Sequence, residues 1–309
     1  MKRFLCAALA ALLLFSLAAC GTGEKKDRPF TVVATIFPLY DWTRCLLGER
    51  AGTTELKLLL DGGVDMHSFQ PTVNDIIAVT DCDVLIYVGG ESDEWIEKAL
   101  KDSAKPGQIR VNLLSLLGPD ALQEELREGM EGENDGASDE HIWLSPRLAR
   151  RLCGLISDAL READPEHAAV YEAAFADYDA LLARLDADYA AAVESASGRT
   201  LLFADRFPFR YLTEDYGLDY YAAFAGCSSE TQASFSTVIF LANKLDELGL
   251  DCVCVIENSD GKLARQVIES SARTDRRILT LHSMQGAVNG ESYLSLMEKN
   301  LAVLKEALG

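Results

Sequence analysis

Three of the four histidines in this sequence lie at positions from which they could bind a metal ion. His67 follows the apolar run ELKLLL after a short polar stretch, and His282 directly follows the apolar run RILTL. Neutral imidazole is the commonest side-chain ligand for zinc and for ions of similar character. The residue types therefore favour a transition-metal site, although no HExxH motif or i,i+4 histidine pair supports one locally.

His141 and Asp205 complete the candidate ligands. Asp205 directly follows the apolar run TLLFA, and in open α/β sheets ligands bind outside the carboxyl ends of the strands. His141 lies between an acidic segment and a helix start at Ser145-Pro146. The remaining histidine, His167, falls in the first turn of a long helix and is expected to be exposed. Ligands drawn from two halves of the chain would couple ion binding to closure of a cleft.

Short apolar runs alternate with helical patterns, which predicts two α/β lobes with central parallel sheets. In the first half, the expected strands are residues 30–37, 55–60, 83–88 and 109–113, with helices over residues 38–47 and 73–80. In the second half, the expected strands are residues 200–204, 218–224, 251–256 and 277–281, with helices over residues 235–248, 261–272 and 292–308. The expected lobes are residues 30–163 and 198–309.

A stretch without helix breakers separates these halves. Asp164-Pro165-Glu166 is typical of a helix start, because Asp is a good N-cap and Pro fits the first helical turn. Helical spacing continues for about 30 residues, or about 45 Å, so we expect a rigid linking helix over residues 164–197. Residues 120–140 are acidic and poor in apolar side chains, and are expected to form a partly helical start followed by a mobile loop.

The first residues are typical of an export signal. Lys2 and Arg3 precede the apolar stretch Phe4–Ala19, which is too short to span a bilayer comfortably. The stretch ends in Leu-Ala-Ala-Cys20 and resembles the lipobox of bacterial lipoproteins, in which the cysteine carries the lipid. We therefore expect a signal peptide over residues 1–19, lipidation of Cys20 and a tether over residues 20–29. No later run has membrane-spanning length, so we expect an extracytoplasmic, lipid-anchored protein.

The composition argues against some partners. The formal net charge of -20 would repel nucleic acid, so no nucleic-acid partner is expected, and it attracts cations diffusely. The chain has eight cysteines, none of which forms a CxxC pair. The cysteine spacing therefore does not support a thiolate zinc site. A disulfide is possible outside the cytoplasm, but the sequence cannot pair the cysteines.

Four motifs, in order along the chain, resemble those of a known family. They are Met66-His67-Ser68-Phe69-Gln70-Pro71 with Asp75, His141-Ile142-Trp143-Leu144-Ser145-Pro146, the segment from Arg210-Tyr211-Leu212 to Tyr216-Gly217-Leu218, and Leu281-His282-Ser283. With these motifs the chain resembles, over nearly its whole length, the metal-specific solute-binding lipoproteins of ABC zinc and manganese importers. The resemblance implies two α/β lobes bridged by one long helix, with a metal cleft between the lobes.

The resemblance also implies a ligand set, with one departure. The family's third ligand falls on Arg206, which has only donors and cannot ligate. Asp205 is the expected substitute and Glu230 the rival oxygen donor. His67, His141, His282 and one carboxylate would form a nitrogen-rich site, which favours Zn²⁺ over Mn²⁺ as the cargo.

The implied role is capture of a divalent metal ion and its delivery to an ABC importer permease, by a monomer without enzymatic activity. Two alternatives remain open. One is a two-lobed binding protein for a metal chelate or organic ligand, whose cleft Trp42, Trp143, Arg206 and Arg210 could line. The other is a surface zinc hydrolase, which three histidines and a bound water would suit, although no general base is evident.

Overall fold

The structure is a computed structural model that describes part of the chain. The described ranges are residues 28–61, 64–103, 105–132, 136–228, 232–285 and 290–309. The predicted signal peptide, Cys20 and Glu230 lie outside the described residues. Residues 31–309 form one compact unit. Among the described residues, no helix combines the length and the apolar character needed to cross a membrane.

The first sheet has the strand order β2-β1-β3-β4, and β3 runs parallel to both of its neighbours. The strands are β1 (Phe30–Ala34), β2 (Thr54–Leu58), β3 (Val84–Tyr87) and β4 (Ile109–Asn112). Every residue of β3 is buried, as expected for a central parallel strand covered by helices on both faces. Val32 pairs with Val84 and Val84 with Ile109, so the carboxyl ends of these strands lie at one edge.

The second sheet has the strand order β6-β5-β7-β8, again with parallel neighbours. The strands are β5 (Thr200–Phe207), β6 (Asp219–Ala225), β7 (Cys252–Ile256) and β8 (Arg277–Leu281). The register between β5 and β6 shifts between Phe203 and Arg206. Such an irregularity re-aims side chains near a strand end, and it falls here on Ala204 and Asp205, directly before Arg206. The two sheets confirm the predicted α/β fold class.

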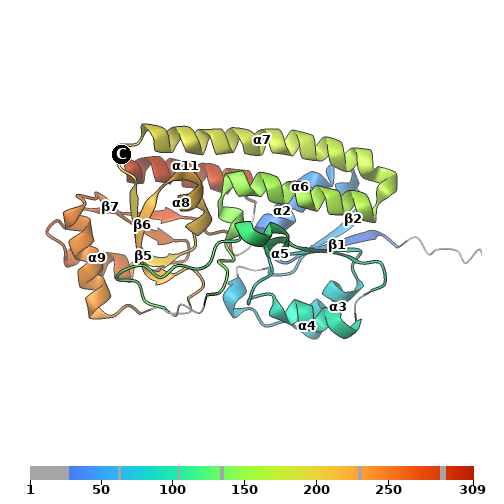
Figure 1. The fold of residues 1–309 in the computed structure, drawn as a ribbon, viewed down its shortest axis with the longest axis horizontal. Helices are drawn as coiled ribbons and strands as arrows, with labels where there is room; N and C mark the ends of the chain where they lie inside the picture. The colour runs from blue at the N-terminus through green and yellow to red at the C-terminus, as the bar shows by residue number, and fades with distance from the viewer. Residues whose placement is uncertain (1–27, 62–63, 104, 133–135, 229–231, 286–289) are drawn as a thin grey trace, which may run out of the picture. The chain divides into compact units, whose positions relative to one another are not determined.

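Helices cover both sheets and connect the strands (Figure 1). In the first half they are α2 (Phe37–Leu46), α3 (Val73–Asp81), α4 (Glu94–Ser103), α5 (Leu113–Leu117) and α6 (Pro146–Ala163), with 3-10 turns η1 (Gly48–Gly52), η2 (Met66–Ser68), η3 (Gly118–Asp120) and η4 (Ile142–Leu144). From residue 164 onward they are the 3-10 turn η5 (Pro165–His167), α7 (Ala168–Ser195), α8 (Arg210–Tyr216), α9 (Phe235–Glu247), α10 (Lys262–Glu269) and α11 (Tyr293–Leu308).

The long helix predicted between the halves is α7, which has 28 residues and contacts both α6 and α11. Figure 1 shows it running alongside these two helices. Its buried side chains recur at helical spacing and include Tyr171, Tyr178 and Tyr189. The helix begins later than expected, because Asp164 starts the 3-10 turn η5 and accepts hydrogen bonds from His167 and Tyr171 instead of capping α7.

The acidic segment, residues 120–140, corrects one expectation, because its described residues after Asp120 contain no helix. Instead the segment runs to the second sheet, where Glu131 N–H donates to Ala223 O at 2.8 Å and Glu131 pairs with Phe224. Arg127 lies over the ring of Tyr220, 3.9 Å from its centroid. Tertiary hydrogen bonds thus replace the local ones that a helix would have supplied.

Buried hydrogen bonds join parts of the chain that are far apart in sequence. The Trp143 indole N–H donates to Ser283 O at 2.7 Å, and the Tyr293 hydroxyl donates to Trp143 O at 2.8 Å. The Tyr293 N–H donates to Asp41 Oδ2 at 2.8 Å. Both aromatic side chains are fully buried. The two sheets are therefore held together by a packed, hydrogen-bonded interior as well as by α7.

Candidate metal centre

His67 is held by the 3-10 turn η2. Asp65 caps this turn, since its Oδ1 accepts the His67 backbone N–H at 3.0 Å, and the buried Met66 anchors it. The His67 ring is fixed through Nδ1, which lies 2.9 Å from Ser92 Oγ. The Ser92 hydroxyl can donate to Nδ1 or accept from it, and in either case it orients the ring so that Nε2 points away from Ser92.

His141 is fully buried at the end of the acidic segment. Asp139 Oδ1 accepts both the His141 backbone N–H at 2.8 Å and the ring Nδ1–H at 3.0 Å. A carboxylate can only accept, so the hydrogen bond places the proton on Nδ1 and leaves Nε2 as an acceptor. Metal-binding histidines commonly have this arrangement, because the carboxylate fixes the ring and raises its basicity.

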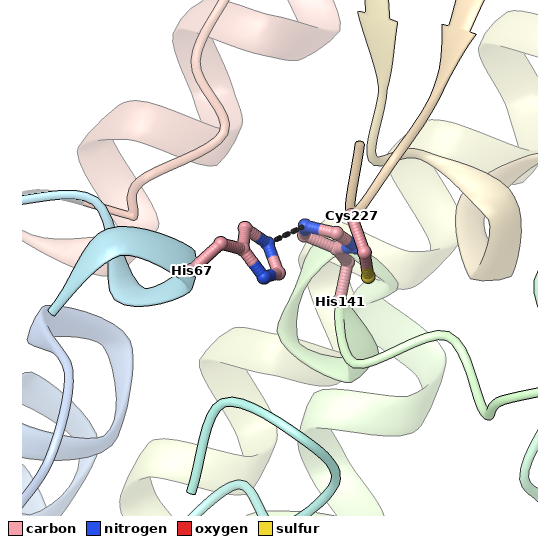
Figure 2. A group of neighbouring side chains, drawn as sticks. All are labelled: His67, His141 and Cys227. Carbon is pink, nitrogen blue, oxygen red and sulfur yellow. Dashed lines mark hydrogen bonds between the residues drawn. The ribbon is translucent and has the colours of Figure 1, made fainter. Parts of the chain in front are cut away.

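The two histidines direct their Nε2 atoms toward each other at 3.2 Å (Figure 2). Two ligands of a tetrahedral zinc ion, each about 2.05 Å from it, are about 3.3 Å apart. The separation of the two nitrogens therefore matches the spacing that such an ion requires. His141 Nε2 is an acceptor, so without an ion His67 Nε2–H can donate to it, and a bound cation would take the place of that proton.

Cys227 is the third member of this group. One donor atom from each of His67, His141 and Cys227 lies within 4.8 Å of the other two. Cys227 follows the end of β6, and Figure 2 shows the three side chains arriving from three separate segments. Burial raises the pKa of the Cys227 thiol, and the nearby carboxylates of Asp139 and Glu124 raise it further. The thiol is therefore protonated while no cation is present.

Gln285 places its amide group beside both imidazoles. With its nitrogen donating to Asp65 Oδ1 at 3.2 Å and Oδ2 at 3.1 Å, its oxygen lies 2.7 Å from His141 Nε2. In the opposite orientation the nitrogen faces His141 Nε2 at 2.7 Å and His67 Nε2 at 3.4 Å. The first orientation satisfies the acceptor-only Asp65 carboxylate, and the second satisfies the lone pair of His141 Nε2; with the His141 proton on Nδ1, neither orientation satisfies both.

The surroundings of the group are rich in buried carboxyl groups. Asp139 and Glu140 are 1% and 2% exposed. Glu140 Oε2 has no hydrogen-bond partner among the described residues, and it lies 3.7 Å from His67 Nδ1. Burial raises the pKa of Glu140. Buried acids without full hydrogen bonding are costly unless a positive charge compensates them, and this cluster would gain from a bound cation.

One fixed positive charge stands at the edge of the group. Arg206 forms an ion pair with Asp65, with Nη2 and Oδ2 2.7 Å apart. Burial opposes ionisation of Asp65, but the Arg206 guanidinium outweighs it and lowers the pKa of this carboxyl. Burial, with the neighbouring His141, lowers the pKa of His67 to about 3. His67 is therefore neutral at pH 7 and its Nε2 is available to a metal ion.

The residues named from the sequence do not all belong to this group. The structure brings His67 and His141 together but leaves His282 and Asp205 outside the group of donors. The His282 backbone exchanges hydrogen bonds with Asn300, and the Asp205 carboxylate accepts from the backbone N–H groups of Arg206 and Ile256. The ligand roles of His282 and Asp205 remain predictions, as does that of Glu230, which lies outside the described residues.

Two site residues did not emerge from the sequence. Cys227 lies two residues after the end of β6, and Gln285 lies three residues after His282. Both come shortly after the carboxyl end of a parallel strand, which is the position that identified Asp205 and His282. This positional signal was therefore available for Cys227 and Gln285, but neither belongs to a local ligand motif.

Comparisons with known proteins show the family of this chain. The sequence profile described as the zinc-uptake complex component A, periplasmic, or ZnuA, matches residues 32–307, which is nearly the whole described chain. The chain belongs to the ZnuA family. This result confirms the resemblance inferred from the four sequence motifs.

Individual relatives cover the same region. The zinc-binding lipoprotein AdcA of Streptococcus pneumoniae (strain TIGR4) is 28% identical over 305 residues, which are 96% of this chain and 60% of AdcA. The chain thus spans about three-fifths of that relative. The high-affinity zinc uptake system protein ZnuA of Bacillus subtilis is 26% identical, covering 96% of this chain and 97% of its own.

A solved structure of the ZnuA family has the same fold. The crystal structure of the Zn(II)-bound ZnuA-like domain of Streptococcus pneumoniae AdcA aligns with a TM-score of 0.72 and 25% identity. The alignment covers 91% of this chain and 99% of that domain. The two α/β lobes described above are therefore the architecture of a ZnuA-like metal-binding domain.

Proposed function

We propose that this chain captures a zinc ion outside the cytoplasm and delivers it to the permease of an ABC importer. The observation that carries the proposal is the 3.2 Å approach of His67 Nε2 to His141 Nε2. These two residues are 74 positions apart in the sequence, yet their second ring nitrogens are both held by other groups. The pair is therefore organised before any ion binds.

The donor types favour zinc over the hard cations. Imidazole nitrogen suits zinc and its neighbours, whereas Ca²⁺, Mg²⁺ and Mn²⁺ prefer carboxylate, carbonyl and water oxygen. The two nitrogens of this site lie at the spacing of tetrahedral zinc ligands. Mn²⁺ is the second cargo that we consider, because the buried carboxyl groups around the histidines could supply oxygen.

The remaining parts of the proposal concern the whole protein. We infer that residues 30–163 and 198–309 act as two lobes that enclose the ion and that the helical stretch 164–197 links them. We also infer that Cys20 carries the lipid, that the chain acts as a monomer and that it binds its cargo without transforming it. The AdcA relative, whose name describes a zinc-binding lipoprotein, supports the cargo and the anchor.

Zinc titration of the purified protein tests the proposal. We expect one zinc ion to bind per chain and to raise the thermal transition, since a ligand at about 1,000 times its Kd adds about 4 kcal/mol to stability. His67→Ala and His141→Ala should each remove most of this gain. His167→Ala is the matched control, because His167 is about one-third exposed and pairs with Asp164 away from the site. A transition that ignores both zinc and chelator would refute the proposal.

The same assay separates the ligands predicted from sequence from those that the structure brings together. His282→Ala and Asp205→Asn should weaken zinc binding only if these residues join the coordination sphere. If both variants bind zinc like the unchanged protein while His67→Ala does not, the ion is held by the group described above. If His282→Ala and Asp205→Asn weaken zinc binding as much as His67→Ala does, the ligand set predicted from the sequence holds the ion.

A further inference from the structure

We propose that Cys227 supplies a thiolate ligand to the captured ion and takes the place of the donor that position 206 does not provide. The inference rests on the proposed function and specifies the donor set of that same site. Cys227 is one of three described residues whose donor atoms gather within 4.8 Å, and the other two are the paired histidines. No resemblance or sequence motif assigns this cysteine a role.

Arg206 cannot fill the third position. Its guanidinium has no lone pair to offer a metal, and its Nη2 is engaged by Asp65 Oδ2 at 2.7 Å. The neighbouring Asp205 is also occupied, because its carboxylate accepts backbone N–H groups at the ends of β5 and β7. A donor from the second sheet must therefore come from another strand end, and Cys227 follows the adjacent strand β6.

The loop that carries Cys227 is built to approach the histidines closely. A Cβ atom at Gly226 would lie 2.9 Å from Phe207 O and 3.1 Å from His141 Cε1. Only glycine therefore lets this loop pack against the imidazole without displacement. The acidic segment also holds the loop, because the Cys227 N–H donates to Glu124 Oε1 at 2.7 Å. Backbone contacts thus place the thiol beside the ring.

The distances are compatible with coordination after a small adjustment. In a tetrahedral zinc site, a sulfur at about 2.3 Å and a nitrogen at about 2.05 Å from the ion are about 3.6 Å apart. The largest separation within the group is no more than 4.8 Å, so a contraction of at most about 1.2 Å would complete the site. As the metal–sulfur bond forms, the thiol releases its proton to solvent and the thiolate offsets one of the two positive charges of the ion.

A thiolate ligand changes which ions the site prefers. Soft sulfur favours Zn²⁺, and more so the softer ion Cd²⁺, over Mn²⁺. The other described cysteines, Cys45, Cys82, Cys153, Cys252 and Cys254, do not belong to the donor group. Cys45 is partly exposed, like Cys227, and therefore serves as a matched control.

Optical spectra of the Co²⁺- and Cd²⁺-loaded protein test the inference. The unchanged protein and Cys45→Ser should develop a thiolate-to-metal charge-transfer band in the ultraviolet as one equivalent binds, and Cys227→Ser should lack it. In competition with a chelator, Cys227→Ser should bind Zn²⁺ at least ten-fold more weakly, because even supporting groups of a metal site contribute 10–100-fold. Binding by Cys45→Ser should be unchanged.

A second measurement needs no variant. X-ray absorption of the zinc-loaded protein should include one sulfur scatterer at about 2.3 Å. If the protein binds one zinc ion but has neither the band nor the sulfur scatterer, the thiolate is not a ligand and the inference is overturned, while the proposed function stands. If the protein binds no zinc and no cobalt, the proposed function itself fails and the inference with it.

Discussion

Asp93 and Glu140 are buried carboxyl groups near the paired histidines, and the charge of Glu140 affects the pKa of Asp93. Asp93 is 4% exposed, and its Oδ2 accepts the Gly89 N–H at 3.0 Å. Burial raises the pKa of Asp93 to about 7; the Gly89 hydrogen bond opposes this and the charge of Glu140 adds to it. Because this pKa lies above the value of an exposed aspartate, Asp93 stabilises the fold at low pH and loses that contribution as the pH rises toward 7.

Replacing this carboxyl group should change the pH dependence of stability. Asp93→Asn keeps an oxygen for the Gly89 N–H but cannot ionise. The free energy of unfolding of the variant, relative to the unchanged protein, should rise by about 2–4 kcal/mol between pH 4 and pH 8, at about 1.4 kcal/mol per pKa unit. Urea unfolding of both metal-free proteins measures the difference. A difference that is constant over this range would contradict the raised pKa.

Among individual residues, the sequence identified the two histidines but not Cys227, the third donor beside them. His67 and His141 stood out because histidine is scarce in the chain and because each belongs to a motif that resembles the family. Cys227 was passed over because its spacing forms no CxxC pair, and that rule reports only on ligands that are neighbours in sequence. Its approach to the histidines depends on how β6 and the acidic segment pack, which spacing does not encode.

The loop after β6 is the element on which the thiol's position depends. Gly226→Ala should force this loop away from His141, because the new Cβ would meet both Phe207 O and the ring at 3.1 Å or less. We expect zinc binding to weaken about ten-fold or more, in line with the loss of groups that position metal ligands. Isothermal titration measures the affinity.

Gly52→Ala is the control for this substitution, because a Cβ there meets nothing within 4 Å. The control should bind zinc as the unchanged protein does. Equal zinc affinity in Gly226→Ala would show that the loop is free to retreat without consequence for the ion, and would argue against the close placement of Cys227.

Glu131, in the acidic segment, caps the start of helix α9. Glu131 Oε1 accepts the Ser234 N–H at 2.7 Å and the Thr237 hydroxyl at 2.5 Å, at the start of α9. A carboxylate at a helix N-terminus is favourable for both its hydrogen bonds and the helix dipole. Glu131→Ala should lower the free energy of unfolding by about 1–2 kcal/mol, measured in urea.

Glu128 lies in the same segment but is exposed. Glu128→Ala should therefore change stability by less than about 0.5 kcal/mol. If both variants are equally stable, the acidic segment does not rest on α9 in solution.

The elements were predicted with uneven success, for physical reasons. Strands such as β3 and β7 are continuous apolar runs, and α7 has sustained helical spacing. The local sequence pattern therefore predicts whether each of these elements is a strand or a helix. The acidic segment has no such period. Its backbone groups bond to Ala223 and its side chains to α9, which are about one hundred positions away in the sequence, so its conformation is set by tertiary contacts.

Across the whole molecule, the ion pair between Asp65 and Arg206 connects the loop after β2 to the end of β5. The two side chains are 28% and 21% exposed, so the pair itself contributes no more than about 1 kcal/mol. The Arg206 charge also reaches the metal centre, since it helps to lower the pKa of His67 after burial and His141. A positive charge near the site opposes the binding of a divalent ion.

Arg206→Gln should therefore strengthen zinc binding. The amide can still donate to Asp65, but the fixed positive charge is gone, and we expect a Kd about ten-fold lower, or about 1.4 kcal/mol. Arg210→Gln is the control, because Arg210 pairs with Glu125 and Glu214 and not with the site. Weaker zinc binding by Arg206→Gln would mean that the link between the lobes matters more than the repulsion.

The guanidinium at position 206 bears on how such a carrier would unload. Differences in affinity between related complexes appear mainly as differences in residence time. A permanent positive charge beside the cargo shortens that residence, and it does so without any change in the two imidazoles that recognise the ion. The chain would thus combine selective recognition of the ion with faster dissociation. That combination suits a protein that must release its cargo to complete its task.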